Sequence, residues 1–123
     1  MIYTSYFAAI RKLPDYIEPV SIARRSPTWY AGKTYLKLAP PWDILEKYKR
    51  DGNEADYIQA YRERVLSRLN PDDLVRELYD GTSKSGIALI CYEKPGDFCH
   101  RHLVADWLNE NRLECLEWEG DST

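Results

Sequence analysis

The sequence lacks the long apolar runs and paired cysteines that mark membrane and secreted proteins. No stretch approaches the roughly 18 uninterrupted apolar residues of a membrane-spanning helix, and no basic leader precedes an apolar run at the start of the chain. The three cysteines are an odd number, which favours reduced thiols over a disulfide framework. We therefore expect a cytoplasmic protein with no membrane partner.

The sequence also lacks the motifs of the commonest enzyme classes. It contains no glycine-rich phosphate loop, no G-x-S-x-G nucleophile elbow and no H-E-x-x-H zinc helix. Close cysteine pairs of the C-x-x-C kind are absent too, which argues against a structural zinc site. We therefore expect neither a metal nor a cofactor, and no reaction follows from motifs alone.

The length and composition of the chain suit one packed domain. The chain has 123 residues, of which 44% are hydrophobic and 13% aromatic, and its net charge is −3. This supply of apolar side chains is ample for a single core, and the charge is too small to favour disorder. We expect one α/β domain over residues 1–119 and a frayed tail over residues 120–123.

Short β-branched and aromatic runs alternate with segments of helical period. Because strands separated by helices favour a parallel sheet, we expect a three-layer α/β fold of Rossmann or flavodoxin type. It should contain a small, mostly parallel sheet of about four strands with helices on both faces, in an order that the sequence leaves open. The strands are expected at 2–8, 19–23, 86–92 and 112–118, and the helices at 42–50, 54–69, 71–79 and 98–109.

Basic residues follow three of the predicted strands. In parallel sheets, ligands bind outside the carboxyl ends of the strands, and a helix beginning near Phe98 would add its positive N-terminal end there. The sequence therefore predicts an anion site suited to phosphate. Solvated loop charges, which would give the same pattern, are the competing interpretation. The predicted anion-binding residues are Arg11, Arg24, Arg25 and Arg101.

The segment Cys91–Arg101 carries the densest chemistry. Cys99, beside His100 at a helix start, is a candidate nucleophile or sensitive thiol, with His100 and Glu93 as proton-handling or orienting partners. Packing of Cys99 as a small apolar residue is the competing interpretation. Cys91, inside an apolar strand, is a structural or redox thiol, and a bond to Cys99 requires Cα atoms within about 7 Å.

A long irregular loop interleaves aromatic and basic residues. Residues 27–37 contain Trp29, Tyr30 and Tyr35 among lysines. Aromatic faces beside positive charge can stack nucleic-acid bases, so this loop is a candidate stacking surface. Packing over the core is the alternative, because tyrosine and tryptophan are frequent throughout the chain.

The run Ala88-Leu89-Ile90-Cys91-Tyr92-Glu93-Lys94, followed by Cys99-His100-Arg101 and an apolar helix, resembles the signature of the uncharacterised DUF488 family. The opening residues 3–7 and the segment 21–27 are similar to its short-form members. The resemblance implies that the functional residues are those that match the motif, namely Cys91, Glu93, Cys99, His100, Arg101 and, at the strand end, Arg24. It implies no particular reaction.

Two functions from different classes remain. The first is a site, enzymatic in character, at the start of the helix that carries Cys99-His100-Arg101, for an anionic small molecule, a nucleotide or a nucleic-acid end. The second is a non-catalytic nucleic-acid or protein-binding module that uses the loop 27–37. A purely structural role for the cysteines is the third interpretation, and the oligomeric state is outside what the sequence gives.

Overall fold

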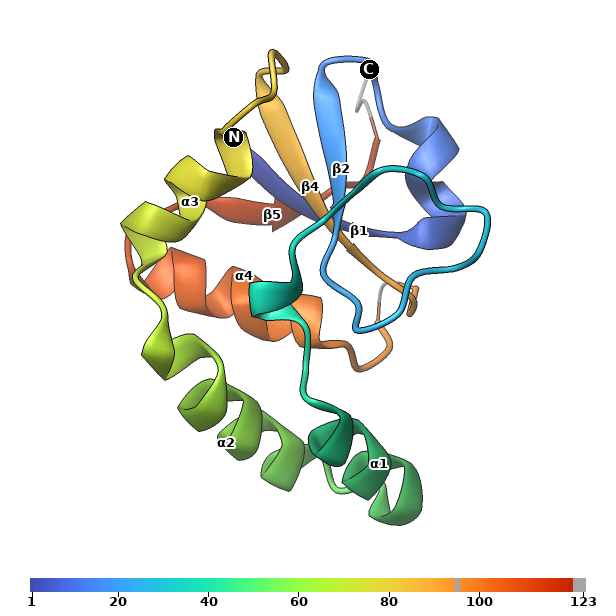
Figure 1. Cartoon of the computed structure of the whole chain (residues 1–123), viewed down its shortest axis with the longest axis vertical. Helices are drawn as coiled ribbons and strands as arrows, with labels where there is room; N and C mark the ends of the chain where they lie inside the picture. Colours follow the sequence, from blue (N-terminus) through green and yellow to red (C-terminus); the bar gives the residue numbers. More distant parts are fainter. Residues whose placement is uncertain (95, 121–123) are drawn as a thin grey trace.

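The computed structural model describes residues 1–94 and 96–120, and in this part of the chain the strands form one parallel sheet (Figure 1). Residues 121–123 of the expected tail lie outside the described residues. The sheet has five strands in the order β3-β2-β4-β1-β5. The strands are β1 (Ile2–Tyr6), β2 (Ile17–Ser21), β3 (Lys33–Thr34), β4 (Gly86–Cys91) and β5 (Cys115–Glu117).

Four α-helices and three short 3-10 helices connect the strands. The α-helices are α1 (Trp42–Asp51), α2 (Glu54–Arg64), α3 (Pro71–Tyr79) and α4 (His100–Glu110). The 3-10 helices are η1 (Phe7–Lys12), η2 (Leu36–Leu38) and η3 (Leu66–Arg68). The predicted α/β fold is confirmed, and no helix in the described ranges is long and apolar enough to cross a membrane.

The extra strand, β3, is the main difference from the prediction. It has two exposed residues, and it pairs with the end of β2 through Val20 with Lys33 and Ser21 with Thr34. Such a short exposed edge strand carries no apolar alternation, so its sequence looks like the loop around it.

The central strand β4 is buried along its whole length, as its continuous apolar run predicts. One of its faces, with Ile87 and Leu89, packs against the four α-helices. The other face, with Ala88 and Ile90, packs against η1 and the loop that follows β2. The sheet is therefore covered on both sides, on one of them by a 3-10 helix, which begins at Phe7 where a longer first strand was expected.

Asparagine and glycine set the ends of three of these helices. Asn53 and Asn70 each accept a hydrogen bond from a backbone N–H in the first turn of α2 and α3. Gly52 ends α1 in the left-handed conformation, at φ +61°. At α4, Cys99 occupies the N-cap position and makes no capping hydrogen bond through its side chain.

All strands being parallel, their carboxyl ends lie at one edge of the sheet. β4 ends at Cys91, and the chain returns after a short connection to begin α4 at His100. This connection brings the start of α4 beside the end of β4, where the candidate site lies.

The central position of β4 predicts a large effect of truncation there. Leu89 is fully buried, and Leu89→Ala should lower the free energy of unfolding by about 2–5 kcal/mol, because it leaves a cavity between the sheet and the helices. The matched change Leu116→Ala, on the half-exposed side of β5, should cost no more than about 0.5 kcal/mol. Urea unfolding of both variants measures the difference, and similar losses would contradict this account of the core.

Candidate functional site

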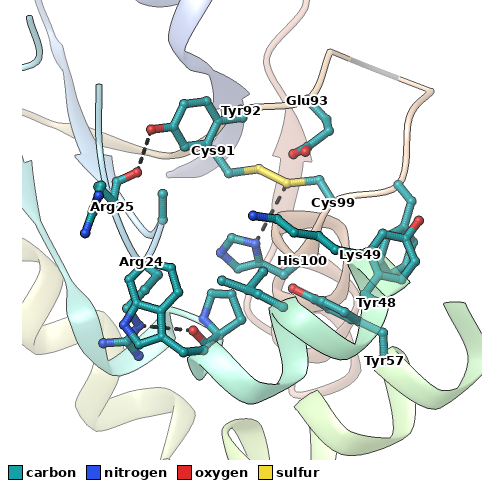
Figure 2. Close-up of a pocket in the computed structure, with 15 residues that line it drawn as sticks. Arg24, Arg25, Tyr48, Lys49, Tyr57, Cys91, Tyr92, Glu93, Cys99 and His100 are labelled. Atoms are coloured by element: carbon teal, nitrogen blue, oxygen red, sulfur yellow. Dashed lines mark hydrogen bonds between the residues drawn. A yellow bond between two sulfur atoms is a disulfide. The ribbon is translucent and has the colours of Figure 1, made fainter. Parts of the chain in front are cut away.

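A pocket of about 380 Å³ opens at the carboxyl edge of the sheet (Figure 2). Its walls come from the end of β2, from α1 and α2, and from the segment that joins β4 to α4. The lining residues that matter for its chemistry are Arg24, Arg25, Trp42, Tyr48, Lys49, Tyr57, Cys91, Tyr92, Glu93, Phe98, Cys99 and His100.

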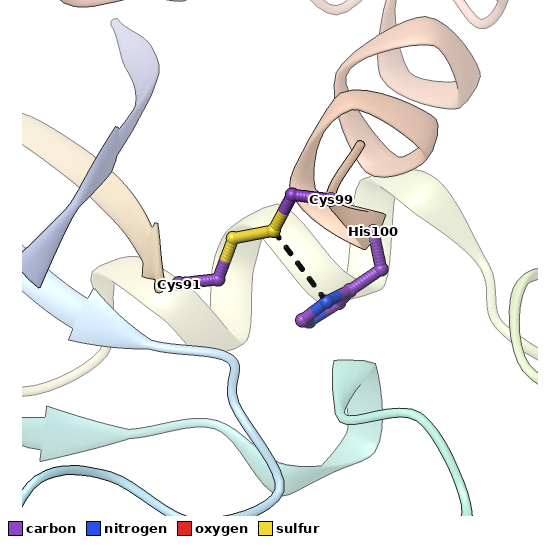
Figure 3. A group of neighbouring side chains, drawn as sticks. All are labelled: Cys91, Cys99 and His100. Atoms are coloured by element: carbon purple, nitrogen blue, oxygen red, sulfur yellow. Dashed lines mark hydrogen bonds between the residues drawn. A yellow bond between two sulfur atoms is a disulfide. The ribbon is translucent and has the colours of Figure 1, made fainter. Parts of the chain in front are cut away.

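Two cysteines meet at the floor of this pocket. Cys91 ends β4, Cys99 caps α4, and a disulfide joins them with their Cα atoms 7.2 Å apart (Figure 3). The expectation of separate reduced thiols is therefore wrong for this pair, because the return of the chain into α4 places residues eight positions apart face to face. Cys115 is free and buried, and burial raises the pKa of its thiol to about 12.

His100 lies beside the sulfur atoms in a fixed orientation. Its Nε2 is 2.7 Å from the backbone oxygen of Ile22, so Nε2 carries the proton and donates it to that carbonyl. The unprotonated Nδ1 then faces Sγ of Cys99 at 3.9 Å. Burial lowers the pKa of His100 to about 4, so the ring is neutral at neutral pH.

The three side chains together form a compact group of ligating atoms. Sγ of Cys91, Sγ of Cys99 and a ring nitrogen of His100 all lie within 4.8 Å of one another, and all three residues are buried. Thiolates and imidazole are the ligands of soft and borderline metal ions. From the sequence, Cys91, Cys99, His100 and His102 raise the question of a metal, but no metal was expected, because these residues lack the spacing of a zinc motif. The structure brings three of them together from two elements.

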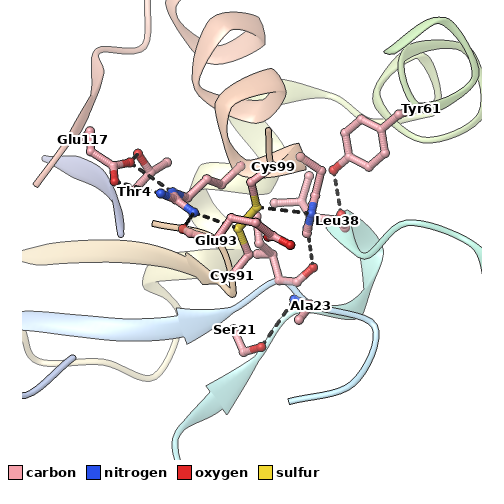
Figure 4. The surroundings of a disulfide bond; sticks show 12 residues. Thr4, Ser21, Ala23, Leu38, Tyr61, Cys91, Glu93, Cys99 and Glu117 are labelled. Atoms are coloured by element: carbon pink, nitrogen blue, oxygen red, sulfur yellow. Dashed lines mark hydrogen bonds and ion pairs between the residues drawn. A yellow bond between two sulfur atoms is a disulfide. The ribbon is translucent and has the colours of Figure 1, made fainter. Parts of the chain in front are cut away.

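Arg101 lies behind the floor and not in the pocket. Its side chain is fully buried, and its Nε and Nη2 each donate to a carboxylate oxygen of Glu117 at 3.0 Å (Figure 4). Its Nη1 donates to Sγ of Cys91 at 3.1 Å and to the backbone oxygen of Glu93. The guanidinium is thus occupied inside the protein, so the expectation that Arg101 holds an external anion is not retained.

Three other basic side chains do line the pocket (Figure 2). Arg24 donates from Nε and Nη2 to the backbone oxygens of Pro40 and Ala39, both at 3.1 Å. The guanidinium of Arg25 lies 5.6 Å from the ring centre of Trp42. Lys49, on α1, was not predicted. Arg11 was predicted to belong to the anion site. It lies instead in η1, on the other face of the sheet, and is not among the lining residues.

Glu93 supplies a carboxylate next to the sulfur atoms. It is exposed and lines the pocket, and Figure 2 shows its carboxylate turned toward the disulfide. The prediction that Glu93 lies near Cys99 and His100 therefore has the geometry it needs, although its role as a base stays a prediction.

Aromatic rings form much of the wall. Tyr48 and Tyr57 pack against Phe98, with ring centres 5.2 and 5.0 Å away, and Trp42 and Tyr92 complete the set. Burial raises the pKa of Tyr57, so its hydroxyl stays protonated. The sequence alone does not indicate this role for Tyr48 and Tyr57, because helical spacing looks the same for a core stripe and a pocket wall.

The predicted stacking loop packs elsewhere. The hydroxyl of Tyr30 donates to the backbone oxygen of Lys33, and the hydroxyl of Tyr35 donates to Glu77. Trp29 is 61% exposed and lies edge-on to Phe7, with ring centres 6.1 Å apart. Two of the three rings are thus held by internal hydrogen bonds. Tyr30 packs on the face of the sheet that η1 covers, and Tyr35 packs on the face that the α-helices cover.

The buried neutral His100 predicts a stability that depends on pH. Between the ordinary pKa of 6.5 and about 4, the unfolded chain binds more protons than the folded one, so stability rises with pH. Lowering the pH from 7 to 4.5 should cost about 2–3 kcal/mol through this residue. Urea unfolding at the two pH values should show that His100→Gln loses this component, whereas His102→Gln keeps most of it. An unchanged slope in His100→Gln would contradict the assignment.

The Arg101–Glu117 pair predicts a second effect on stability. Arg101→Gln leaves the Glu117 carboxylate without its bidentate partner, and should cost about 3–5 kcal/mol. Arg62 makes the same bidentate contact with Glu110 at the surface, so Arg62→Gln should cost less than about 1 kcal/mol. Equal losses in urea unfolding would argue against a special role for burial.

Comparison with known protein families places the chain in a family of uncharacterised proteins. A family profile described as DUF488-N3a, active DUF488-N3 subclade, matches residues 9–112. The matched range contains the whole segment from Cys91 to Arg101 and every residue that lines the pocket. Neither the curated proteins nor the solved structures contain a significant match to the chain.

Proposed function

The chain belongs to the DUF488 family, and from the chemistry of its pocket we propose that it binds a phosphate-bearing ligand with a flat ring, such as a nucleotide or a nucleic-acid end. The observation that carries the proposal is one pocket in which basic side chains, aromatic rings and the Cys99–His100 pair come together. The description of the matched subclade as active agrees with a site that performs chemistry.

The charges of the pocket favour an anion. Arg24, Arg25 and Lys49 are opposed by the single carboxylate of Glu93 among the lining residues. Two nitrogens of Arg24 hold loop carbonyls, so this side chain is fixed in place and its remaining nitrogen is the one that would meet the ligand. The start of α4 adds backbone N–H groups and the positive end of the helix dipole on the same side.

The aromatic wall favours a ligand with a flat ring. Trp42, Tyr48, Tyr92 and Phe98 offer apolar faces, and base–aromatic stacking contributes about 1–3 kcal/mol per base. The volume of about 380 Å³ lies within the usual range of small-molecule sites and suits a mononucleotide or a terminal nucleotide of a chain.

The reactive part of the proposed site is its floor. In the reduced protein, Nδ1 of His100 is the acceptor that can take the thiol proton of Cys99, while Ile22 holds the other ring nitrogen. Glu93 is placed to orient a ligand group or a water molecule. Cys99, His100 and Glu93 are therefore the residues that we propose for the chemistry, and Arg24, Arg25 and Lys49 those for the anion.

Binding of adenosine monophosphate and of a short 5′-phosphorylated single-stranded oligonucleotide tests the proposal by calorimetry. Both should bind more tightly than unphosphorylated adenosine, and binding should weaken with added salt. Arg25→Ala and Lys49→Ala should each raise the dissociation constant about 10-fold, because each removes a charged hydrogen bond.

Two charge-matched controls keep this test specific. Arg50→Ala removes a charge from the same helix as Lys49 but outside the pocket lining, and Arg11→Ala removes one from the opposite face of the sheet. Both should bind like the wild type. Failure of the folded wild type to bind either compound, or equal weakening by the controls, would reject the proposal.

A further inference from the structure

The floor of the pocket brings together three metal-ligating side chains. We propose that, once the disulfide is reduced, Cys91, Cys99 and His100 bind one Zn²⁺ ion whose open position faces the pocket. This inference goes beyond the proposed function, and it is tested without the phosphate-bearing ligand.

The distances suit such a site after a small movement of side chains. Ligands about 2.0–2.3 Å from a tetrahedral zinc ion lie about 3–4 Å from one another, and the three ligand atoms are already within 4.8 Å. The Cα atoms of Cys91 and Cys99 are 7.2 Å apart, above the roughly 4.4–6.8 Å common for disulfides. The backbone therefore already holds the two cysteines farther apart than a disulfide commonly requires, which suits an ion between the two sulfur atoms once they are reduced.

His100 has the orientation of a metal ligand. Its Nε2–H donates to the backbone oxygen of Ile22, which fixes the tautomer and directs the Nδ1 lone pair toward the cysteines. Metal-bound histidines in proteins commonly donate their other N–H to a carbonyl in this way.

The charges around the floor also balance. Two thiolates neutralise the double charge of the ion, which a buried site requires. Nη1 of Arg101 already donates to Sγ of Cys91 at 3.1 Å, so this ligand atom has a charged hydrogen-bond donor behind the floor of the pocket. The positive charge of Arg101 is itself offset by Glu117, so it adds little repulsion toward the ion.

The fourth position would face the pocket. Catalytic zinc sites use three protein ligands and leave one position for water or substrate, whereas structural sites use four. Here the side chain of Glu93 is turned toward the sulfur atoms from the pocket side (Figure 2), where it can contact a bound water. Ligands of the pocket would approach the ion from the same side.

Binding requires a change of oxidation state. The disulfide first takes up two electrons and two protons from a dithiol reductant, which is itself oxidised to a disulfide, and this gives two thiols on the protein. Zn²⁺ then replaces the two thiol protons, while His100 enters as the neutral ring. The oxidised protein should therefore bind no zinc at this site.

Titration of the protein with Zn²⁺ against a chromophoric chelator, after reduction with a water-soluble phosphine under nitrogen, tests the inference. The reduced wild type should bind about one ion per chain, and Co²⁺ should give the absorption of thiolate-bound cobalt. Cys99→Ser and His100→Gln should weaken binding by more than about 100-fold, the upper limit for loss of an outer partner. Cys115→Ser removes a buried cysteine outside the cluster, and should bind like the wild type.

The outcomes of this titration distinguish a zinc site at the three residues from its absence. Far-ultraviolet circular dichroism first establishes that each variant is folded, and calorimetry in two buffers should show protons released on binding by the wild type. If the reduced, folded wild type binds zinc no more tightly than Cys99→Ser, or if the oxidised protein binds it equally well, the inference is overturned. Arg25→Ala should keep full zinc affinity, so a failure of the phosphate proposal leaves this result unaffected.

Discussion

The candidate site depends on one buried guanidinium. Arg101, in the first turn of α4, binds Glu117 of β5, the backbone oxygen of Glu93 and the sulfur of Cys91 at the end of β4. It thus ties the start of α4 to two strands that are far apart in sequence. Since Cys99 and His100 directly precede Arg101, this single set of contacts fixes where the two stand relative to the sheet.

The residues around Arg101 form two layers that differ in their access to ligands. The inner layer, with Arg101, Glu117 and Thr4, is closed to ligands and holds geometry. The outer layer, with Arg24, Lys49 and the aromatic rings, is open and offers binding surface. The sulfur atoms and His100 lie between these two layers. They are held in place by the interior, and they can be reached from the pocket.

Much of the fold could be predicted, because the signals were local. The apolar run of β4, the helical period of α2 and the caps at Asn53 and Asn70 each depend on neighbouring residues. The cysteine segment was selected as the candidate site for the same reason, and it lines the pocket. The contacts between distant residues could not be predicted. Nothing near Arg101 in the sequence indicates Glu117, and nothing near Lys49 indicates a pocket. Such contacts arise from the packing of distant elements.

The edge strands of the sheet affect whether copies of the protein aggregate. β3 has two exposed residues, one of them Lys33, and β5 has three residues, so neither border offers a long row of unpaired backbone groups. A long, flat border would act as a template on which a second chain could add a strand and start an aggregate. Short, charged edge strands do not provide such a template. A sheet with an apolar centre can therefore remain free of aggregation when the protein is concentrated.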